Sequence, residues 1–127
     1  MNLDTASKAV CRASECETVD VPWGQLRLSA ARAIGNSTSL SFGRVTILAG
    51  HANSRHRHPN CDEILHVLSG QLEHSLGEAV FVMEPGDTIS IPQGVWHQAR
   101  ATSEVDAEIV ICFSSADRIT EIDQGQR

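Results

Sequence analysis

Several common partner classes are excluded by what this sequence has little of. It has a single lysine, Lys8, and no hydrophobic run near the ~20 residues that a membrane-spanning helix needs. Ten lysines and arginines stand against sixteen aspartates and glutamates, which gives a formal net charge of −6. A protein that binds nucleic acid needs a cationic face, and these arginines are scattered. We therefore expect neither nucleic acid nor a membrane as a partner.

The chain also lacks the marks of a disordered, repetitive or secreted protein. Its 127 residues, 41% of them hydrophobic, show no low-complexity segment and fit one compact domain. The four cysteines contain no CxxC pair, and the N-terminus lacks the basic start and apolar stretch of a secretory signal. We expect free thiols and a cytoplasmic protein, with a Cys11–Cys16 pair as the less favoured alternative.

The hydrophobic pattern is that of an all-β protein. Short apolar segments alternate with polar residues and are separated by glycine, proline, asparagine or serine, which is typical of a sandwich or barrel. We expect a polar N-terminal arm over residues 1–20, a barrel over 21–114 and a C-terminal tail over 115–127. Helical signals are weak: residues 30–34 fit one turn, and residues 115–122 fit a short amphipathic helix in the tail. Strands are predicted at 25–29, 40–49, 63–68, 71–76, 79–83, 88–91, 97–101 and 107–113.

Six histidines stand out in the composition, and several have spacings that suit a metal site. His56 and His58 are two residues apart, so on a strand they point to the same face. A turn at Pro59 and Asn60 lets Glu63 return to that face from a second strand, and His97 approaches after a turn of its own. Three imidazoles and one carboxylate suit one divalent transition metal: Fe(II), Mn(II), Ni(II), Co(II) or Zn(II).

Two spaced motifs resemble those of the cupin superfamily. Residues 50–70 match glycine-x5-His-x-His-x4-Glu-x6-glycine in full, and residues 86–97 match glycine-x5-Pro-x-Gly-x2-His. The asparagine that normally completes the second motif falls at Ala101, which affects the packing of that turn. The resemblance implies a small double-stranded β-helix, or jelly-roll, barrel of the single-domain kind, commonly a homodimer. It also implies a metal held by His56, His58, Glu63 and His97, without an organic cofactor.

The other histidines have weaker claims to a role. His74 shares a strand face with Leu72 and Leu76, so it should point into the barrel. There it is either a cavity-lining catalytic residue or a core histidine with its hydrogen bonds satisfied. His66 has the opposite parity to Glu63 and should face away from the metal, and His51 should be solvated.

Alanines, arginines and phenylalanines give further expectations about the cavity and the core. Small side chains at Ala99 and Ala101 follow His97 on its face and would leave room for a substrate. Arg44 and Arg100 are candidates for binding a substrate carboxylate, although exposed arginines are more often simply solvated. Core positions are expected for the three phenylalanines, Phe42, Phe81 and Phe113.

The four ligands would leave two positions of an octahedral metal for a small-molecule substrate. The leading interpretation is a metal-dependent enzyme, first a dioxygenase-like oxidoreductase acting on an enol, diketone or phenolic compound. The alternatives are an isomerase, lyase or cyclase that stabilises an enolate, and a non-catalytic module that binds a small ligand.

Overall fold

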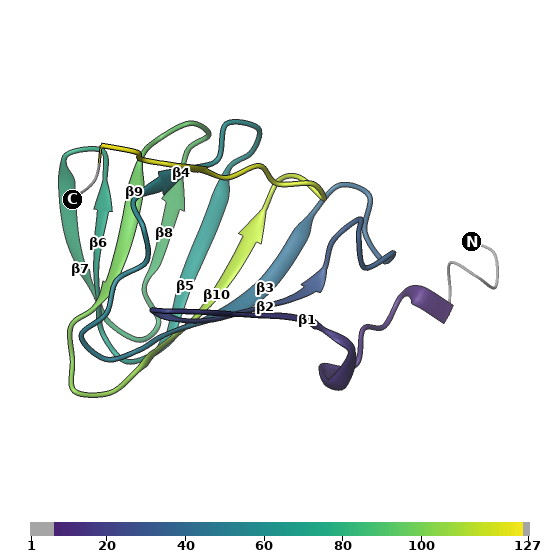
Figure 1. The fold of residues 1–127 in the computed structure, drawn as a ribbon, viewed down its shortest axis with the longest axis horizontal. Helices are drawn as coiled ribbons and strands as arrows, with labels where there is room; N and C mark the ends of the chain where they lie inside the picture. The colour runs from purple at the N-terminus through teal and green to yellow at the C-terminus, as the bar shows by residue number, and fades with distance from the viewer. Residues whose placement is uncertain (1–6, 126–127) are drawn as a thin grey trace.

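The chain folds into two antiparallel sheets that face each other, in agreement with the predicted all-β jelly roll (Figure 1). The computed structural model describes residues 7–125. The six-stranded sheet has the order β1 (Glu17–Val21), β2 (Gly24–Ala30), β3 (Ser41–Ile47), β10 (Ala107–Phe113), β5 (Glu63–Ser69) and β8 (Thr88–Ile91). The five-stranded sheet has the order β11 (Glu121–Ile122), β4 (His56–Arg57), β9 (His97–Ala101), β6 (Leu72–Leu76) and β7 (Ala79–Met83).

The core lies between the sheets and follows the alternation of their strands. In β3 and β10 every second residue is buried, which places Val45, Ile47, Ile109 and Ile111 on the inner face. Leu72 enters the same core from the opposite sheet. Burial of each such aliphatic side chain contributes roughly 1.5–3 kcal/mol, and this holds the sheets together.

Gly70 makes the turn that carries the chain from one sheet to the other, between β5 and β6. Its φ is +80°, a left-handed conformation that favours glycine. A Cβ at this position would lie 2.7 Å from the carbonyl oxygen of Asp106. Both the torsion and the close approach therefore require a glycine here.

The N-terminal segment joins the sheet earlier than expected. A short 3-10 helix covers Ala13–Glu15, and β1 then begins at Glu17, inside the range predicted to be an arm. Val21 pairs with Gly24 across a tight turn, and the register continues to Glu17 opposite Leu28. The side chains of β1 are largely exposed, so backbone hydrogen bonds are its main link to the sheet. A polar segment held in this way has no hydrophobic pattern from which a strand could be predicted.

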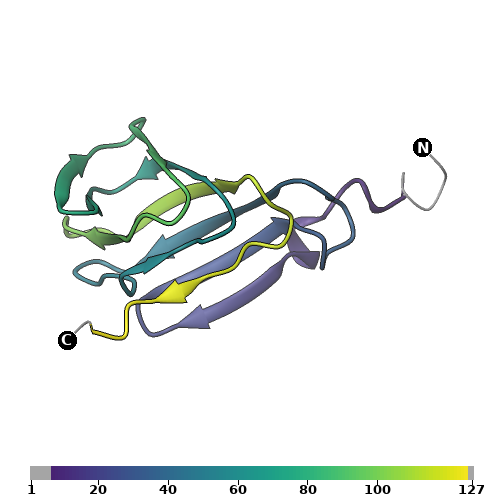
Figure 2. The same ribbon diagram turned by 90° about the horizontal axis from the view of Figure 1, so that it is seen from above.

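The predicted short helix at residues 115–122 is wrong. This segment is extended, crosses the strand ends at one end of the barrel and forms β11, which pairs with β4 (Figures 1 and 2). Long-range hydrogen bonds hold it, including those from Asn60 Nδ2 to the Asp117 carbonyl and from the Ile119 amide to Asn60 Oδ1. These contacts outweigh a weak local helical preference.

Helical structure is sparse elsewhere too. The single turn expected at residues 30–34 is closed by the Gly35 amide, which donates to the carbonyls of Ala31 and Arg32. In the part of the chain that the structure describes, no helix has the length and hydropathy to cross a membrane.

Candidate metal centre

Strands of both sheets bring the four predicted ligands together at one end of the barrel. His56 opens β4 and His97 opens β9, and the two residues are directly paired in the five-stranded sheet. His58 lies one residue beyond β4, and Glu63 opens β5 in the opposite sheet. One ligand atom from each residue lies within 4.8 Å of the others. The cluster thus bridges the two sheets.

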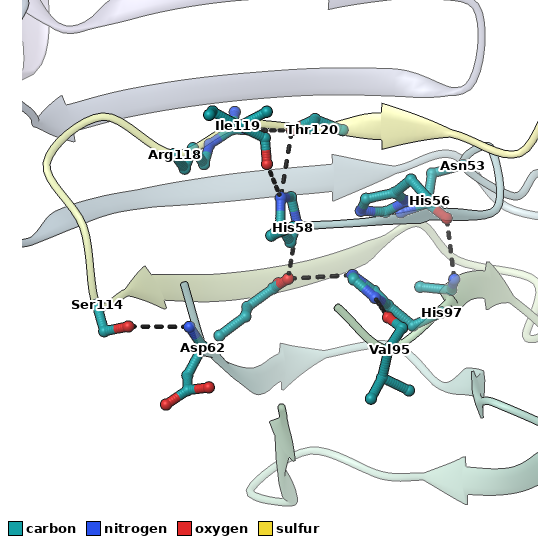
Figure 3. A network of polar contacts seen from close by, with 12 residues as sticks. Asn53, His56, His58, Asp62, Val95, His97, Ser114, Arg118, Ile119 and Thr120 are labelled. Carbon is teal, nitrogen blue, oxygen red and sulfur yellow. Dashed lines mark hydrogen bonds and ion pairs between the residues drawn. The ribbon is translucent and has the colours of Figure 1, made fainter. Parts of the chain in front are cut away.

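Glu63 lies at the centre of this cluster. Its Oε1 atom is 3.2 Å from His58 Nε2 and 3.2 Å from His97 Nε2, and dashed lines in Figure 3 mark these two contacts at the labelled imidazoles. All three residues are buried. Burial raises the pKa of the Glu63 carboxyl, but the influence of the adjacent His58 and His97 imidazoles outweighs it and lowers the pKa to about 2. Glu63 is therefore a carboxylate at neutral pH.

Backbone carbonyls fix which imidazole nitrogen is free to bind a metal. The Nδ1 atoms of His56, His58 and His97 lie 2.7, 3.0 and 2.9 Å from the carbonyl oxygens of Ser54, Ile119 and Val95. Because a carbonyl only accepts, each Nδ1 carries the proton and donates. In its neutral form each ring therefore presents an Nε2 lone pair, the usual arrangement for a histidine ligand.

The donor set fits a divalent cation. Burial and the neighbouring His97 lower the pKa of His56 to about 4, so its imidazole is neutral at pH 7. Three buried atoms have no hydrogen-bond partner: His58 Nε2, His97 Nε2 and Glu63 Oε1. Both nitrogens nevertheless lie 3.2 Å from the carboxylate oxygen. Convergent acceptor atoms of this kind are satisfied together by one cation, and nitrogen and oxygen donors favour a borderline or hard metal.

Cys61 lies near this cluster but is not part of it. The thiol is buried, and burial, followed by the charge of Glu63, raises its pKa. Only a thiolate is a good metal ligand, so a neutral Cys61 leaves the four-residue set unchanged.

The cluster opens into a cavity of about 270 Å³ between the sheets. Its walls are mostly apolar, and they come from both sheets and from the C-terminal segment. Besides the four ligands, the lining residues are Val21, Trp23, Leu26, Val45, Asn53, Ser54, Leu65, His74, Ile109, Ile111, Phe113, Arg118, Thr120 and Ile122.

Comparison with known proteins identifies the family. A family model described as "Cupin domain" matches residues 43–113, which include all four ligands. The chain belongs to the cupin family. Protein SchB of Streptomyces halstedii is 30% identical over 96 residues, which cover 72% of this chain and 70% of SchB.

Plant cupins are also similar over the ligand-bearing region. Germin-like protein 3-8 of Oryza sativa subsp. japonica is 31% identical over 85 residues, which cover 63% of this chain and 38% of that protein. Oxalate oxidase GF-2.8 of Triticum aestivum is 30% identical over 88 residues, covering 63% of this chain and 39% of the oxidase. The chain thus spans well under half the length of these plant relatives.

Solved structures support the same barrel. A variant of Bacillus subtilis oxalate decarboxylase superimposes with a TM-score of 0.79 at 18% identity, covering 87% of this chain and 31% of the decarboxylase. A recombinant oxalate oxidase in complex with glycolate gives a TM-score of 0.72 at 24% identity, covering 80% and 56%. At these identities the likeness establishes the fold.

His74 of this cupin lies inside the barrel, where strand alternation places it. It is fully buried and lines the cavity, and its ring stacks on that of His97 with centroids 5.9 Å apart and planes 9° apart. Neither ring nitrogen has a hydrogen-bond partner. Burial, followed by the charge of His97, lowers the pKa of His74 to about 4. A catalytic role for this neutral imidazole stays a prediction.

The other sequence candidates lie away from the cavity. His66 contacts Thr88 Oγ1 at 2.7 Å on the outer face, and His51 is exposed. Arg44 forms an ion pair with Glu108 outside the barrel, and Arg100 is exposed. Neither arginine is placed to bind a substrate in the cavity.

The prediction that Ala99 and Ala101 leave room for a substrate is wrong. Both alanines are buried in the hydrophobic core and neither is among the lining residues. Two of the three phenylalanines were also wrongly assigned to the core, because Phe42 is 43% exposed and Phe81 is 47% exposed. Phe113 alone of the three is buried.

The structure adds polar cavity residues that the sequence did not single out. Asn53 accepts a hydrogen bond from the Ala99 amide, and Thr120 Oγ1 lies 3.3 Å from His58 Nδ1. Arg118 reaches the cavity from the C-terminal segment. Strand periodicity carried no signal for Arg118 or Thr120, because both lie beyond the last predicted strand.

Proposed function

We propose that this cupin is a metal-dependent enzyme that acts on a small molecule bound beside His56, His58, Glu63 and His97. The observation that carries the proposal is a set of three imidazoles and one carboxylate, buried except for the half-buried His56, that opens into a cavity of about 270 Å³. A bound divalent metal would supply Lewis acidity and, if it were iron or manganese, redox chemistry.

Within this class we propose an oxidoreductase of the dioxygenase type, acting on an enol, diketone or phenolic substrate. Several curated relatives are named oxalate oxidases, from wheat and from Hordeum vulgare, which supports an oxidative reaction in this part of the family. The apolar parts of the cavity wall suit a substrate with an apolar body.

His74 favours a second candidate, an isomerase, lyase or cyclase that works through an enolate. Its neutral imidazole is buried in the cavity, and neither nitrogen is occupied by another residue. Such a group can accept a proton from a substrate carbon or return one, without any oxidation step.

Metal analysis followed by oxygen uptake tests these alternatives. The purified protein would be analysed for metal, then reconstituted separately with Fe(II), Mn(II) and Zn(II) and mixed with a panel of diketones and phenols. Oxygen consumption that requires Fe(II) or Mn(II) supports the oxidoreductase. Substrate conversion without oxygen uptake, lost in His74→Gln, supports the second candidate. A protein that retains no metal and converts no substrate would contradict the enzyme class and leave a ligand-binding module.

We also propose that the protein is a cytoplasmic homodimer. All four cysteines are free, which suits a reducing compartment. On the outer face of the six-stranded sheet, Cys112 of β10 pairs with Phe42 of β3 and with Ile64 of β5. Phe42 and Ile64 are each 43% exposed, and this apolar strip gives a second copy a surface to cover.

A further inference from the structure

Arg118 is a positively charged residue in a cavity that is otherwise mostly apolar. It belongs to the segment between β10 and β11, which passes over the metal ligands (Figure 3). The preceding strand ends at Phe113, and the Arg118 guanidinium packs 5.0 Å from the centre of that ring. The following residue, Ile119, gives its carbonyl to His58. The segment therefore holds Arg118 beside the candidate metal centre.

One edge of the Arg118 guanidinium is not engaged by the protein. Nη1 donates to Thr120 Oγ1 at 2.8 Å, whereas Nε is buried without a hydrogen-bond partner. Among residues 7–125 no carboxylate forms an ion pair with Arg118, although five other arginines have such partners. The Nε and Nη2 edge is the pair of donors with which arginine binds a carboxylate through two parallel hydrogen bonds.

The charge of the cavity favours an anionic ligand. Apart from the imidazoles, Arg118 and Glu63 are the only ionisable side chains among the residues that line it. Glu63 balances Arg118 in the protein alone. A divalent cation at the four-ligand site would leave a surplus of positive charge, which a carboxylate substrate reduces.

We propose that Arg118 is a substrate-binding residue that selects small carboxylic acids with an apolar body. The substrate carboxylate pairs with the free Nε and Nη2 edge, and the apolar body packs against Leu26, Val45 and Ile109. The proposal refines the substrate class of the function proposed above and uses the same cavity. Arg118 itself binds no metal, so its removal leaves the four ligands in place.

Binding of benzoate to the metal-free protein and to the zinc-loaded protein tests this assignment. Benzoate has a carboxylate on an apolar ring, and benzamide is its neutral counterpart of nearly the same shape. Titrations would be followed by calorimetry and by the 15N and 1H signals of the Arg118 side-chain Nε. We expect benzoate to bind at least tenfold more tightly than benzamide and to shift the Nε signals.

Three variants separate charge, geometry and general effects. Arg118→Gln should weaken benzoate binding at least tenfold and leave benzamide binding unchanged. Arg118→Lys keeps the charge without the two-donor edge, so its affinity for benzoate should lie between those of the wild type and Arg118→Gln. Arg100→Gln, which removes an exposed arginine outside the cavity, should bind benzoate like the wild type. Thermal unfolding and zinc content would establish that each variant folds and retains the metal site.

The assignment is overturned if benzoate fails to bind both the metal-free and the zinc-loaded wild type at 50 mM, if benzamide binds as tightly, or if Arg118→Gln binds benzoate unchanged. Failure of the proposed function has a different signature. In that case benzoate binding depends on Arg118, while the wild type retains no metal and turns over no substrate.

Discussion

The metal ligands of this cupin are oriented by backbone carbonyls as much as by their own strands. Each histidine ligand donates from Nδ1 to a backbone carbonyl. For His56 and His97 this carbonyl lies two residues earlier in the chain, and for His58 it belongs to the C-terminal segment. Every Nε2 atom is therefore left free. A neutral ring held in one tautomer binds a metal without first losing a proton. At the residue scale, the cluster is therefore prepared for a cation.

Replacement of Glu63 or His58 by alanine should sharply reduce metal occupancy. Either change removes a donor from a four-donor set, and we expect metal affinity to fall at least ~10-fold, the smallest effect typical of lost supporting residues around a metal. Metal content after dialysis against a weak chelator would measure it. His66→Ala is the matched control, because His66 lies on the outer face. Full occupancy in both ligand variants would show that the assignment is wrong.

His74 should make the metal-free protein less stable in acid. Its pKa is about 4 when folded and near the ordinary 6.5 when unfolded, so between these values the unfolded chain binds more protons. The free energy of unfolding therefore falls as the pH drops from about 6.5 towards 4. His74→Leu removes this contribution, on the order of 2 kcal/mol at pH 4.5.

Urea unfolding at pH 7.5 and 4.5 measures the effect of His74. The wild type should lose more stability between the two pH values than His74→Leu does. His51→Leu changes an exposed histidine and should keep the wild-type difference. Equal losses in wild type and His74→Leu would contradict a depressed pKa for His74.

At the scale of elements, the C-terminal segment forms part of the metal centre and of the cavity wall. It supplies the carbonyl that orients His58, it carries Arg118 and Thr120 into the cavity, and it ends in β11 against β4. Asn60 fastens it to the barrel through one donated and one accepted hydrogen bond, each 2.9 Å long. Each such bond contributes about 1 kcal/mol, so a single side chain has a large influence on where the segment lies.

Asn60→Ala should weaken metal binding although no ligand is changed. Loss of both bonds frees the segment and removes the partner of His58 Nδ1, and we expect roughly 10-fold weaker metal affinity by chelator competition. Asn36→Ala is a matched control, since Asn36 also makes two backbone hydrogen bonds, to Ser29 and Ala31, far along the chain from the ligands. Equal affinities for the two variants would argue against a role for the segment.

At the scale of the whole molecule, the outer face of the six-stranded sheet carries the apolar strip that we propose as the dimer interface. Leu68, 41% exposed, lies further along β5 on the same face, and His66 separates it from the strip formed by Phe42, Cys112 and Ile64. Charged residues lie on the same face beside the strip: Arg44 is two residues from Phe42 on β3 and opposite Val110 of β10, and both Arg27 and Arg44 pair with Glu108.

Ile64→Glu should convert the proposed dimer to a monomer. A glutamate in the middle of the strip would have to be buried without a partner on dimerisation, which is unfavourable by several kcal/mol. Light scattering coupled to size-exclusion chromatography measures the mass. Val80→Glu, at an exposed position of β7 in the other sheet, should leave the dimer intact. A monomeric wild type, or a dimeric Ile64→Glu, would reject this interface.

Much of the site could be predicted because its determinants are local. The two-residue spacing of His56 and His58 fixes a common face on any extended strand, and turns restrict where Glu63 and His97 return. The same parity rule, applied to β3, also explains the wrong assignment of Phe42, since Val45 and Ile47 occupy the inward positions. Phe81 needed more than parity: it is paired with buried His74, but β7 is an edge strand and leaves it exposed.

The sequence by itself determined an all-β barrel and the identity of the four candidate ligands, since alternation, turn residues and motif spacing act over short stretches of chain. Only the tertiary structure decided the course of residues 115–122, the exposure of the phenylalanines and the entry of Arg118 into the cavity. These features depend on hydrogen bonds and packing between segments distant in sequence, such as Asn60 with Ile119. Local periodicity contains no information about such partners.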